Sequence, residues 1–444
     1  MIVWIVNSLF LSIWCFVLLR WRVPSSLRPF LIPGMVFKII AGILLGLLYQ
    51  FYYKEEGDTF FLFNLASYLS ELLPGRPKDF FNILLFNDFD AESKTFFFVW
   101  NQPRALFFVK ILALINSITQ SNYWLTSVYM SLFSFTGLWY LSSFLVKSYD
   151  IPGYLAALAF LLFPSFVFWS SGVLKESIMT GLIGILLVSV LKLLRPDPGY
   201  RLLNILLAII SFIILLQLKY YYAGIIGASL LAYCFTKIVI RMQPGNIAIP
   251  PAFLLLFFLA AGFGLATLLH PNMNINSFPE ALYTNYTATL TKSADPDYLI
   301  TDFKPTWTSI LLNSPQALYQ GLLGPGIWSV QTTIQIPAAL ENLFLLVLIT
   351  VIILYRTYIG DWKLSTEGLI ILIYVVVSAT FMAYASPNFG SLIRYKTGYL
   401  PFLILLAGYR NPIIGYFFSG SEIRRQERQS GSDTTPVKEK NIIK

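Results

Sequence analysis

Long apolar runs of about 20 residues, separated by charged residues, proline or glycine, recur along almost the whole of this 444-residue chain. A helix of about 20 apolar residues is long enough to cross the ~30 Å hydrocarbon core of a bilayer. Hydrophobic residues make up 57% of the chain and charged residues only 12%, where a soluble domain has about a quarter charged. Because the alternating segments of a membrane β-barrel are missing, the pattern predicts an all-α, polytopic transmembrane helical bundle.

The apolar runs predict about eleven spans. They cover residues 1–19, 30–53, 123–146, 152–170, 176–194, 202–218, 222–240, 250–269, 339–356, 367–384 and 397–411. A further run, residues 105–120, carries Lys110 in its middle, and a lysine at the bilayer centre costs ~2.5 to 3.5 kcal/mol on insertion scales. We expect this run to be interfacial or re-entrant, although a full crossing would raise the number of spans to about twelve. The alternative is that residues 152–170 form the incomplete crossing.

Basic residues in the short loops set the predicted sidedness, because loops rich in Lys and Arg stay in the cytoplasm. These residues are Arg20, Arg22, Arg28, Lys192, Arg195, Arg201, Lys237, Arg241, Arg356 and Lys363. The N-terminus is therefore expected outside and the C-terminus in the cytoplasm. The transmembrane domain is expected to cover residues 1–418, with two large outer loops bearing interfacial helices at about 54–103 and 270–338. The basic tail, residues 419–444, is expected to be disordered and cytoplasmic.

The composition also argues against several kinds of partner and site. The net charge of +9 arises because the basic residues of the predicted cytoplasmic loops outnumber the acidic residues of the predicted outer loops. It therefore does not indicate nucleic-acid binding. The two cysteines, Cys15 and Cys234, lie far apart in apolar runs, and His270 is the one histidine. A disulfide framework and an imidazole metal site are therefore not predicted. Any bound divalent cation would use carboxylates, which suits Mg²⁺ or Mn²⁺.

Acidic residues gather where the second span ends, at Glu55, Glu56 and Asp58. A Glu-x-Asp spacing lets two carboxylates converge on one hydroxyl or one divalent cation, so these residues are candidates for a general base or a metal site. The alternative is that a solvated span boundary attracts charge and that Gly57 and Asp58 form a turn. The sidedness rule places this group on the outer face.

Charged residues also interrupt the apolar runs at later points of the predicted outer face. Lys175 and Glu176 follow a polar break at Ser170 to Gly172, and ionisable residues in or near a membrane favour a functional interpretation. The alternative is that this pair only begins a helix, where an acidic residue suits the N-terminus.

Three further basic residues run against the inside bias, namely Lys219, Arg394 and Lys396. Arginine offers a planar fork for phosphate oxygens and lysine a point charge, so these residues are candidates for binding a phosphate or pyrophosphate head group. The alternatives are an aromatic belt formed by the three tyrosines after Lys219 and simple anchoring of the last span to lipid phosphates.

These features together resemble the GT-C class of membrane glycosyltransferases. Glu56-Gly57-Asp58 matches the Asp-x-Asp or Glu-x-Asp type motif that this class carries in its first outer loop. Residues 164–177, and the stretch from Pro387 to Lys396, are similar to segments of bacterial polysaccharide-synthesis membrane proteins. The resemblance covers the chain to about residue 411, but the Trp-Trp-Asp pattern of oligosaccharyltransferases is missing. Transfer to protein asparagine is therefore not expected.

The resemblance implies a bacterial inner-membrane enzyme that moves a sugar from a polyprenyl-phosphate-linked donor to a saccharide, protein or lipid acceptor. Asp58 is then expected to be the general base, with Glu56 orienting it or sharing a divalent cation. The residues expected to bind the donor and its phosphate are Lys175, Glu176, Lys219, Arg394 and Lys396. Membrane lipids are the other expected partners.

Two other interpretations stay open. The chain could be an envelope polysaccharide polymerase or ligase that relies on outer arginine and lysine residues and needs no carboxylate base. It could also be a transporter or a non-catalytic scaffold for lipid-linked saccharides. Transporters often contain paired repeats and broken helices, and neither is evident in the sequence.

Overall fold

The computed structural model describes residues 2–54, 58–89, 102–195, 199–243, 249–267, 274–292, 297–360 and 364–418. Within these ranges every regular element is a helix and no strand is found, so the predicted all-α class is confirmed. Seven of the described helices are long and apolar enough to cross a membrane. They cover Val3–Arg20, Arg28–Tyr52, Tyr123–Ser148, Lys175–Leu193, Arg201–Met242, Thr333–Ile359 and Thr366–Ala385. Glu55, Glu56, His270 and the tail 419–444 lie outside the described residues.

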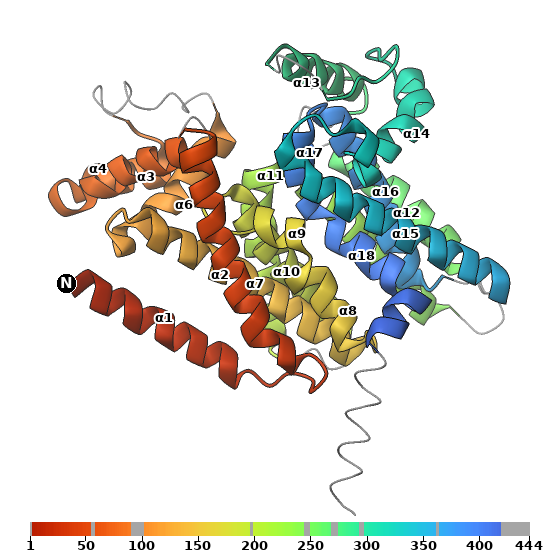
Figure 1. Cartoon of the computed structure of the whole chain (residues 1–444), viewed down its shortest axis with the longest axis horizontal. Coiled ribbons are helices and arrows are strands. Elements are labelled where there is room, and N and C mark those ends of the chain that lie inside the picture. Colours follow the sequence, from red (N-terminus) through yellow and green to blue (C-terminus); the bar gives the residue numbers. More distant parts are fainter. Residues whose placement is uncertain are drawn as a thin grey trace, which may run out of the picture.

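The order of the described helices along the chain can be followed in Figure 1. The first part of the chain contains α1 (Ile2–Arg20), η1 (Arg28–Phe30), α2 (Leu31–Leu47), η2 (Leu48–Tyr52), α3 (Asp58–Gly75), α4 (Pro77–Phe86), α6 (Pro103–Thr119) and α7 (Tyr123–Ser148). The middle part contains α8 (Gly153–Ala157), η3 (Leu158–Leu162), α9 (Pro164–Trp169), α10 (Lys175–Leu193), α11 (Arg201–Met242) and α12 (Pro251–Ala266). The last part contains α13 (Phe278–Lys292), α14 (Trp307–Leu323), η5 (Ile327–Ser329), η6 (Thr333–Gln335), α15 (Ile336–Ile359), α16 (Thr366–Ala385), α17 (Phe389–Tyr395), η7 (Lys396–Gly398) and α18 (Leu400–Gly408).

The run 152–170 is not one straight helix. It forms α8, η3 and α9, with a break at Phe163, whose backbone is extended (φ −66°, ψ 118°). Phe163 precedes Pro164, and the proline ring disfavours helical geometry in the residue before it. A second non-helical stretch, Ser170 to Leu174, separates α9 from α10. The short helix α9 is therefore bounded by a break at each end.

Helix α11 folds back on itself at Lys219, which has non-helical angles (φ −148°, ψ 70°). A Cβ added at Gly227 would lie 2.9 Å from a ring carbon of Phe212. In a straight helix these two residues would stand about 22 Å apart, because each residue adds about 1.5 Å. The halves before and after Lys219 therefore form a hairpin, with Lys219 at its tip.

The centre of the bundle depends on a close approach of α7 and α10. A Cβ added at Gly137 of α7 would lie 2.1 Å from the carbonyl oxygen of Gly181, and one added at Gly184 would lie 2.2 Å from the carbonyl oxygen of Gly137. Small residues let membrane helices pack backbone against backbone in this way, where van der Waals contact and not water exclusion holds them together. The polar end of α10 is thereby placed inside the bundle.

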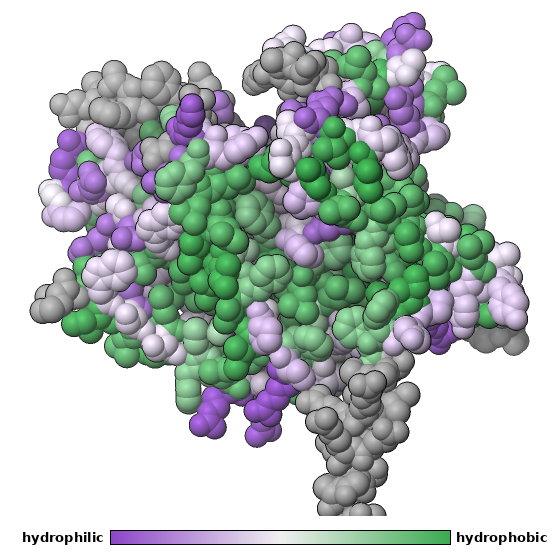
Figure 2. All heavy atoms as spheres, in the orientation of Figure 1, coloured by the Kyte–Doolittle hydropathy of each residue, from purple (hydrophilic) through white to green (hydrophobic). Residues whose placement is uncertain are grey.

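Helices α3, α4 and α6 pack together at one side of the bundle, at the left of Figure 1. Lys110 of α6 donates to the carbonyl oxygen of Leu84 and to Asn87 Oδ1, each at 2.7 Å, where α4 ends. The ammonium group therefore satisfies groups at the end of a neighbouring helix and is buried from lipid. Figure 2 shows a broad hydrophobic band across the molecule, with hydrophilic residues gathered above and below it.

Candidate functional site

A buried ionic cluster joins three helices. Glu176, in the first turn of α10, lies with Oε1 at 2.9 Å from Lys219 Nζ and 3.3 Å from Arg394 Nε. Only 3% of the Glu176 side chain is exposed, with 7% for Lys219 and 16% for Arg394. Pairing is required at such burial, because an isolated charge removed from water is very costly. We refer to Glu176, Lys219 and Arg394 as the ionic cluster.

Each helix brings its residue to this place for a local reason. Glu176 lies at the N-terminus of α10, where the helix dipole favours a carboxylate. Lys219 reaches the cluster because it forms the tip of the α11 hairpin. Arg394 is carried by α17, whose position is held at its start by the Asp297 carboxylate, which accepts from the Phe389 N–H. At its end the Tyr222 hydroxyl donates to the carbonyl oxygen of Tyr395.

Tyrosine rings enclose the two cations. The Lys219 ammonium lies 4.3 Å from the ring centroid of Tyr395 and 5.7 Å from that of Tyr221, and the Arg394 guanidinium carbon lies 5.4 Å from the Tyr395 ring. Burial by itself would raise the pKa of the Tyr395 phenol. The neighbouring cations of Lys219 and Arg394 outweigh burial and hold this pKa below its ordinary value. A tyrosine that ionises more easily than an ordinary one thus lies beside the ionic cluster.

Among the described residues, the ionic cluster pairs one carboxylate with two cations. Lys175 precedes Glu176 in the same helical turn. Such a set of groups suits an anion, above all a phosphate, which both guanidinium and ammonium groups bind. It does not suit a divalent metal ion, which the two cations would repel.

Helix α3 adjoins this region through Thr59. The Thr59 hydroxyl donates to the carbonyl oxygen of Val173 at 2.8 Å and lies 3.0 Å from the Tyr123 hydroxyl. Asp58 is the first residue of α3 and directly precedes Thr59. Thr59 is thus bonded to Val173, which lies two residues before Lys175 in the chain. The Asp58 side chain and Glu56 fall outside what the structure describes, as does a metal site built on them. In the described residues no group of three or more Asp, Glu, His or Cys could hold a metal ion.

Lys396 is not brought into the ionic cluster. Its ammonium donates to the carbonyl oxygen of Leu322 at 3.0 Å and to Asn342 Oδ1 at 3.1 Å. Leu322 lies in the last turn of α14, where the orphan carbonyl groups and the helix dipole favour a cation. These contacts favour the structural interpretation of Lys396, as a residue that links α14, α15 and η7.

Two charged residues, the buried Lys38 and the half-buried Glu341, were absent from the sequence-based candidates. Lys38 lies in the middle of α2, is 1% exposed, and donates to the Ser170 hydroxyl. Glu341 of α15 accepts the Ser165 backbone N–H at 2.8 Å. The signal for both was available, because each is a charged residue inside a predicted span. What the sequence does not reveal is that they bind opposite ends of the same short helix, α9.

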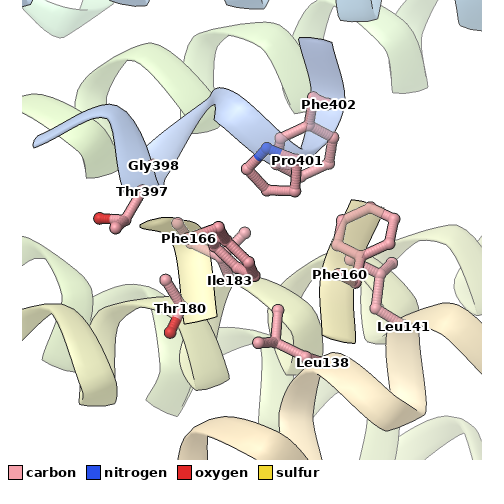
Figure 3. Close-up of a pocket in the computed structure, with 10 residues that line it drawn as sticks. All are labelled: Leu138, Leu141, Phe160, Phe166, Thr180, Ile183, Thr397, Gly398, Pro401 and Phe402. Carbon is pink, nitrogen blue, oxygen red and sulfur yellow. The ribbon is translucent and has the colours of Figure 1, made fainter. Parts of the chain in front are cut away.

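A small apolar cavity of about 10 Å³ lies one helical turn from Glu176. Figure 3 shows the residues that line it. It is lined by Leu138, Leu141, Phe160, Phe166, Thr180, Ile183, Thr397, Gly398, Pro401 and Phe402. Its two threonines are tied to the ionic cluster, since Thr180 donates to the Glu176 carbonyl oxygen (2.9 Å) and Thr397 to the Arg394 carbonyl oxygen (2.8 Å). Ligand pockets usually measure about 300 to 1,000 Å³, so this cavity is too small for a lipid-linked sugar.

Comparisons with models of protein families, with curated proteins and with solved structures gave no match for this chain.

Proposed function

We propose that this chain is a membrane-embedded glycosyltransferase of the GT-C type, which takes a sugar from a polyprenyl-phosphate-linked donor on the outer side of the bacterial inner membrane. The observation that carries the proposal is the ionic cluster of Glu176, Lys219 and Arg394, buried at the meeting point of three helices. Two cations held in place in a buried site suit a leaving phosphate, because negative charge grows on it as the sugar departs.

In this proposal each group has one task. The cations of Lys219 and Arg394, with Lys175 beside them, hold the donor phosphate. Asp58 takes the proton from the acceptor hydroxyl, and Glu56 orients Asp58 or shares Mg²⁺ or Mn²⁺ with it. A single displacement at the anomeric carbon then inverts its configuration. The bond that the Thr59 hydroxyl donates to the Val173 carbonyl oxygen supports this division of tasks, because it ties the start of α3 to the segment before Lys175.

We further propose an N-terminus outside, a cytoplasmic C-terminus and about eleven spans, in which α11 contributes two. The hairpin at Lys219 supports the last point, since each half of α11 is long enough for one crossing. The segments that hold α3, α4, α13 and α14 then form the two outer loops. Lys396 belongs to the supporting structure in this scheme.

The test is sugar release from a lipid donor. The purified protein is placed in liposomes with a long-chain polyprenyl phosphate carrying a tritiated hexose, and a crude saccharide and lipid extract serves as acceptor. We expect label to leave the lipid fraction, and Asp58→Asn, Lys219→Met and Arg394→Ala each to abolish its release. Asp79→Asn, an exposed change on α4, is the matched control and should leave release unchanged.

Other outcomes separate the remaining interpretations. Full activity in Asp58→Asn with none in Arg394→Ala would favour a polysaccharide polymerase or ligase that uses no carboxylate base. Movement of intact labelled donor across the bilayer would favour a transporter, for which the breaks around α9 are the supporting observation. If the label is not released from the lipid and the donor does not cross the bilayer, the glycosyltransferase proposal is contradicted. A scaffold is then the remaining interpretation.

A further inference from the structure

The short helix α9 is a separate rigid piece between two breaks in the chain. Phe163 is extended before Pro164, and the return to helix after Ser170 requires Gly172 in a left-handed conformation (φ 65°) and Leu174 in an extended one. A six-residue helix between two such points has no continuous backbone ladder linking it to its neighbours. Side chains from other helices must therefore hold it in place.

Two ionisable residues hold α9, the half-buried Glu341 at its start and the buried Lys38 at its end. Glu341 of α15 accepts the Ser165 N–H at the start of α9, where a carboxylate is favoured. Lys38 of α2 donates to the hydroxyl of Ser170, the residue that follows the end of α9, and lies 5.3 Å from the ring centroid of Phe166. For Lys38 the structure gives no carboxylate partner among the described residues. Burying a lysine beside a hydroxyl and an aromatic ring costs free energy. The short helix α9 is therefore held by ionisable side chains whose placement inside the molecule is unfavourable by itself.

This helix lies between two lipid-facing surfaces. It contacts both α2 and α15, and Pro164 at its start is exposed. The outward faces of these two neighbours are apolar, with Ile32, Val36 and Ile40 exposed on α2 and Leu340, Leu343 and Phe344 exposed on α15. In Figure 2, residues of low hydropathy interrupt the hydrophobic band near the place where Figure 1 draws α9. Hydrophilic residues at this place are unusual for a surface that only contacts lipid chains.

Behind α9 lie the groups that an anion would meet. Phe166 is fully buried and forms part of the wall of the small cavity in Figure 3. The chain continues from α9 through Ser170 to Lys175 and Glu176. Lys38 contacts the end of this helix at Ser170. The cavity in Figure 3 is too small for a sugar, so a substrate that passes α9 at this place requires an element of the fold to move.

We propose that α9 closes a lateral entrance between α2 and α15, whose occupant is a long-chain lipid phosphate: its chain lies on the apolar faces of α2 and α15 while its anionic head passes α9 to reach the ionic cluster. Opening breaks the bond from Ser165 to Glu341 and that from Lys38 to Ser170, and the freed Lys38 ammonium attracts the phosphate. The inference rests on the proposed function for the identity of the lipid, and on the two contacts of α9 for the entrance.

Photo-crosslinking tests the entrance without requiring catalysis. The full chain in liposomes is exposed to a polyprenyl phosphate with a diazirine in its chain, or to phosphatidylcholine with the same group, and labelled residues are mapped by mass spectrometry. We expect the polyprenyl phosphate to label residues 158–169 and 336–347 above those of α1 and α12, and excess unlabelled polyprenyl phosphate to remove this labelling. Equal labelling of all lipid-facing helices, or the same map for phosphatidylcholine, would overturn the proposal.

Variants test whether the two contacts keep the entrance closed. Glu341→Gln and Lys38→Met should each raise the labelling of buried Phe166 by about tenfold, the effect expected from losing one charge-assisted hydrogen bond. Asp79→Asn should leave it unchanged. A further variant closes the entrance. It carries Ser165→Cys and Glu341→Cys in a chain without Cys15 and Cys234, and a short thiol crosslinker joins the two new cysteines. We expect this variant to lose the labelling of Phe166.

The entrance and the proposed function fail in different ways. Specific labelling at α9 without sugar release would support the entrance and contradict the glycosyltransferase proposal. Sugar release with uniform labelling would contradict the entrance but not the glycosyltransferase. The same holds if Phe166 is still labelled after positions 165 and 341 are joined.

Discussion

Glu176 is one carboxylate shared by two cations from other helices. Its Oε1 lies 2.9 Å from Lys219 Nζ and 3.3 Å from Arg394 Nε, so its negative charge offsets the repulsion between these two cations. A phosphate bound at this site would compete with Glu176 for the same two cations. The residue therefore keeps the cations in place when no phosphate is bound.

Removing this carboxylate should destabilise the fold strongly. Glu176→Gln removes the carboxylate that Lys219 and Arg394 share, and breaking a buried ion pair from one side costs about 3 to 5 kcal/mol. Lys219→Met should cost a similar amount, and the double variant should cost less than the sum of the two. Thermal unfolding of the four proteins in nanodiscs measures this. Asp79→Asn, which breaks the exposed Arg76–Asp79 pair, is the control and should cost about 0 to 1 kcal/mol. Additive effects of the two buried changes would contradict the pairing.

Tyr395 should make stability depend on pH in the alkaline range. Its pKa is below the ordinary tyrosine value because of Lys219 and Arg394, despite burial. For an acidic group whose pKa is lowered by folding, the added stability is complete above the unfolded value of about 10 and is lost as the pH falls through the folded value. The difference in unfolding midpoint between the native chain and Tyr395→Phe should therefore be constant near neutral pH and widen toward pH ~10. A difference that stays flat would show that the two cations do not act on this phenol.

At the scale of elements, close helix packing decides where the charged residues lie. The glycines of α7 and α10 allow backbone contact, and that contact brings the polar start of α10 into the interior. The sequence predicted both helices nearly to their ends, because each is a long apolar run. It did not predict which helices touch, since a glycine inside an apolar run has the same sequence signal whether it faces a helix or lipid.

A methyl group at the contact should separate the two helices. Gly137→Ala places Cβ at 2.1 Å from the Gly181 carbonyl oxygen, so the backbone must move, and overpacking of this kind costs about 1 to 3 kcal/mol or more. Gly264→Ala on α12 is the matched control, because nothing lies within 4 Å of its added Cβ and alanine favours a helix by up to about 1 kcal/mol. Unfolding midpoints in the same nanodiscs compare the two. Equal midpoints would mean that α7 and α10 do not touch at these glycines.

The whole molecule has two chemically different ends. At one end Arg241 donates to the Leu194 carbonyl oxygen and Lys237 pairs with Glu367 at 2.7 Å, which brings the ends of α10 and α11 and the start of α16 together. At the other end lie the ionic cluster and the starts of α3 and α10. The tip of the α11 hairpin belongs to this second end, and both of its termini to the first.

This arrangement predicts which positions share a side of the membrane. Single cysteines replacing exposed Tyr200, Met242 and Tyr358, in a chain without Cys15 and Cys234, should react with a membrane-impermeant thiol reagent from one side only. A cysteine replacing exposed Trp328 should react from the other side. Labelling of sealed vesicles of known orientation measures this. Reaction of positions 200 and 242 from opposite sides would mean that α11 crosses once, which would contradict the hairpin.

The sequence by itself determined the all-α membrane class and the extent of the long helices, because the length and hydropathy of an apolar run are local properties that the bilayer selects directly. It also singled out Glu176, Lys219 and Arg394, since a charge beside an apolar run is conspicuous. Only the tertiary structure decided that these three meet while Lys396 does not, and that Lys38 and Glu341 hold the two ends of α9. The reason is physical: which charges become neighbours depends on the folding back of α11 and on the packing of α7 against α10, and these contacts join residues far apart in the chain.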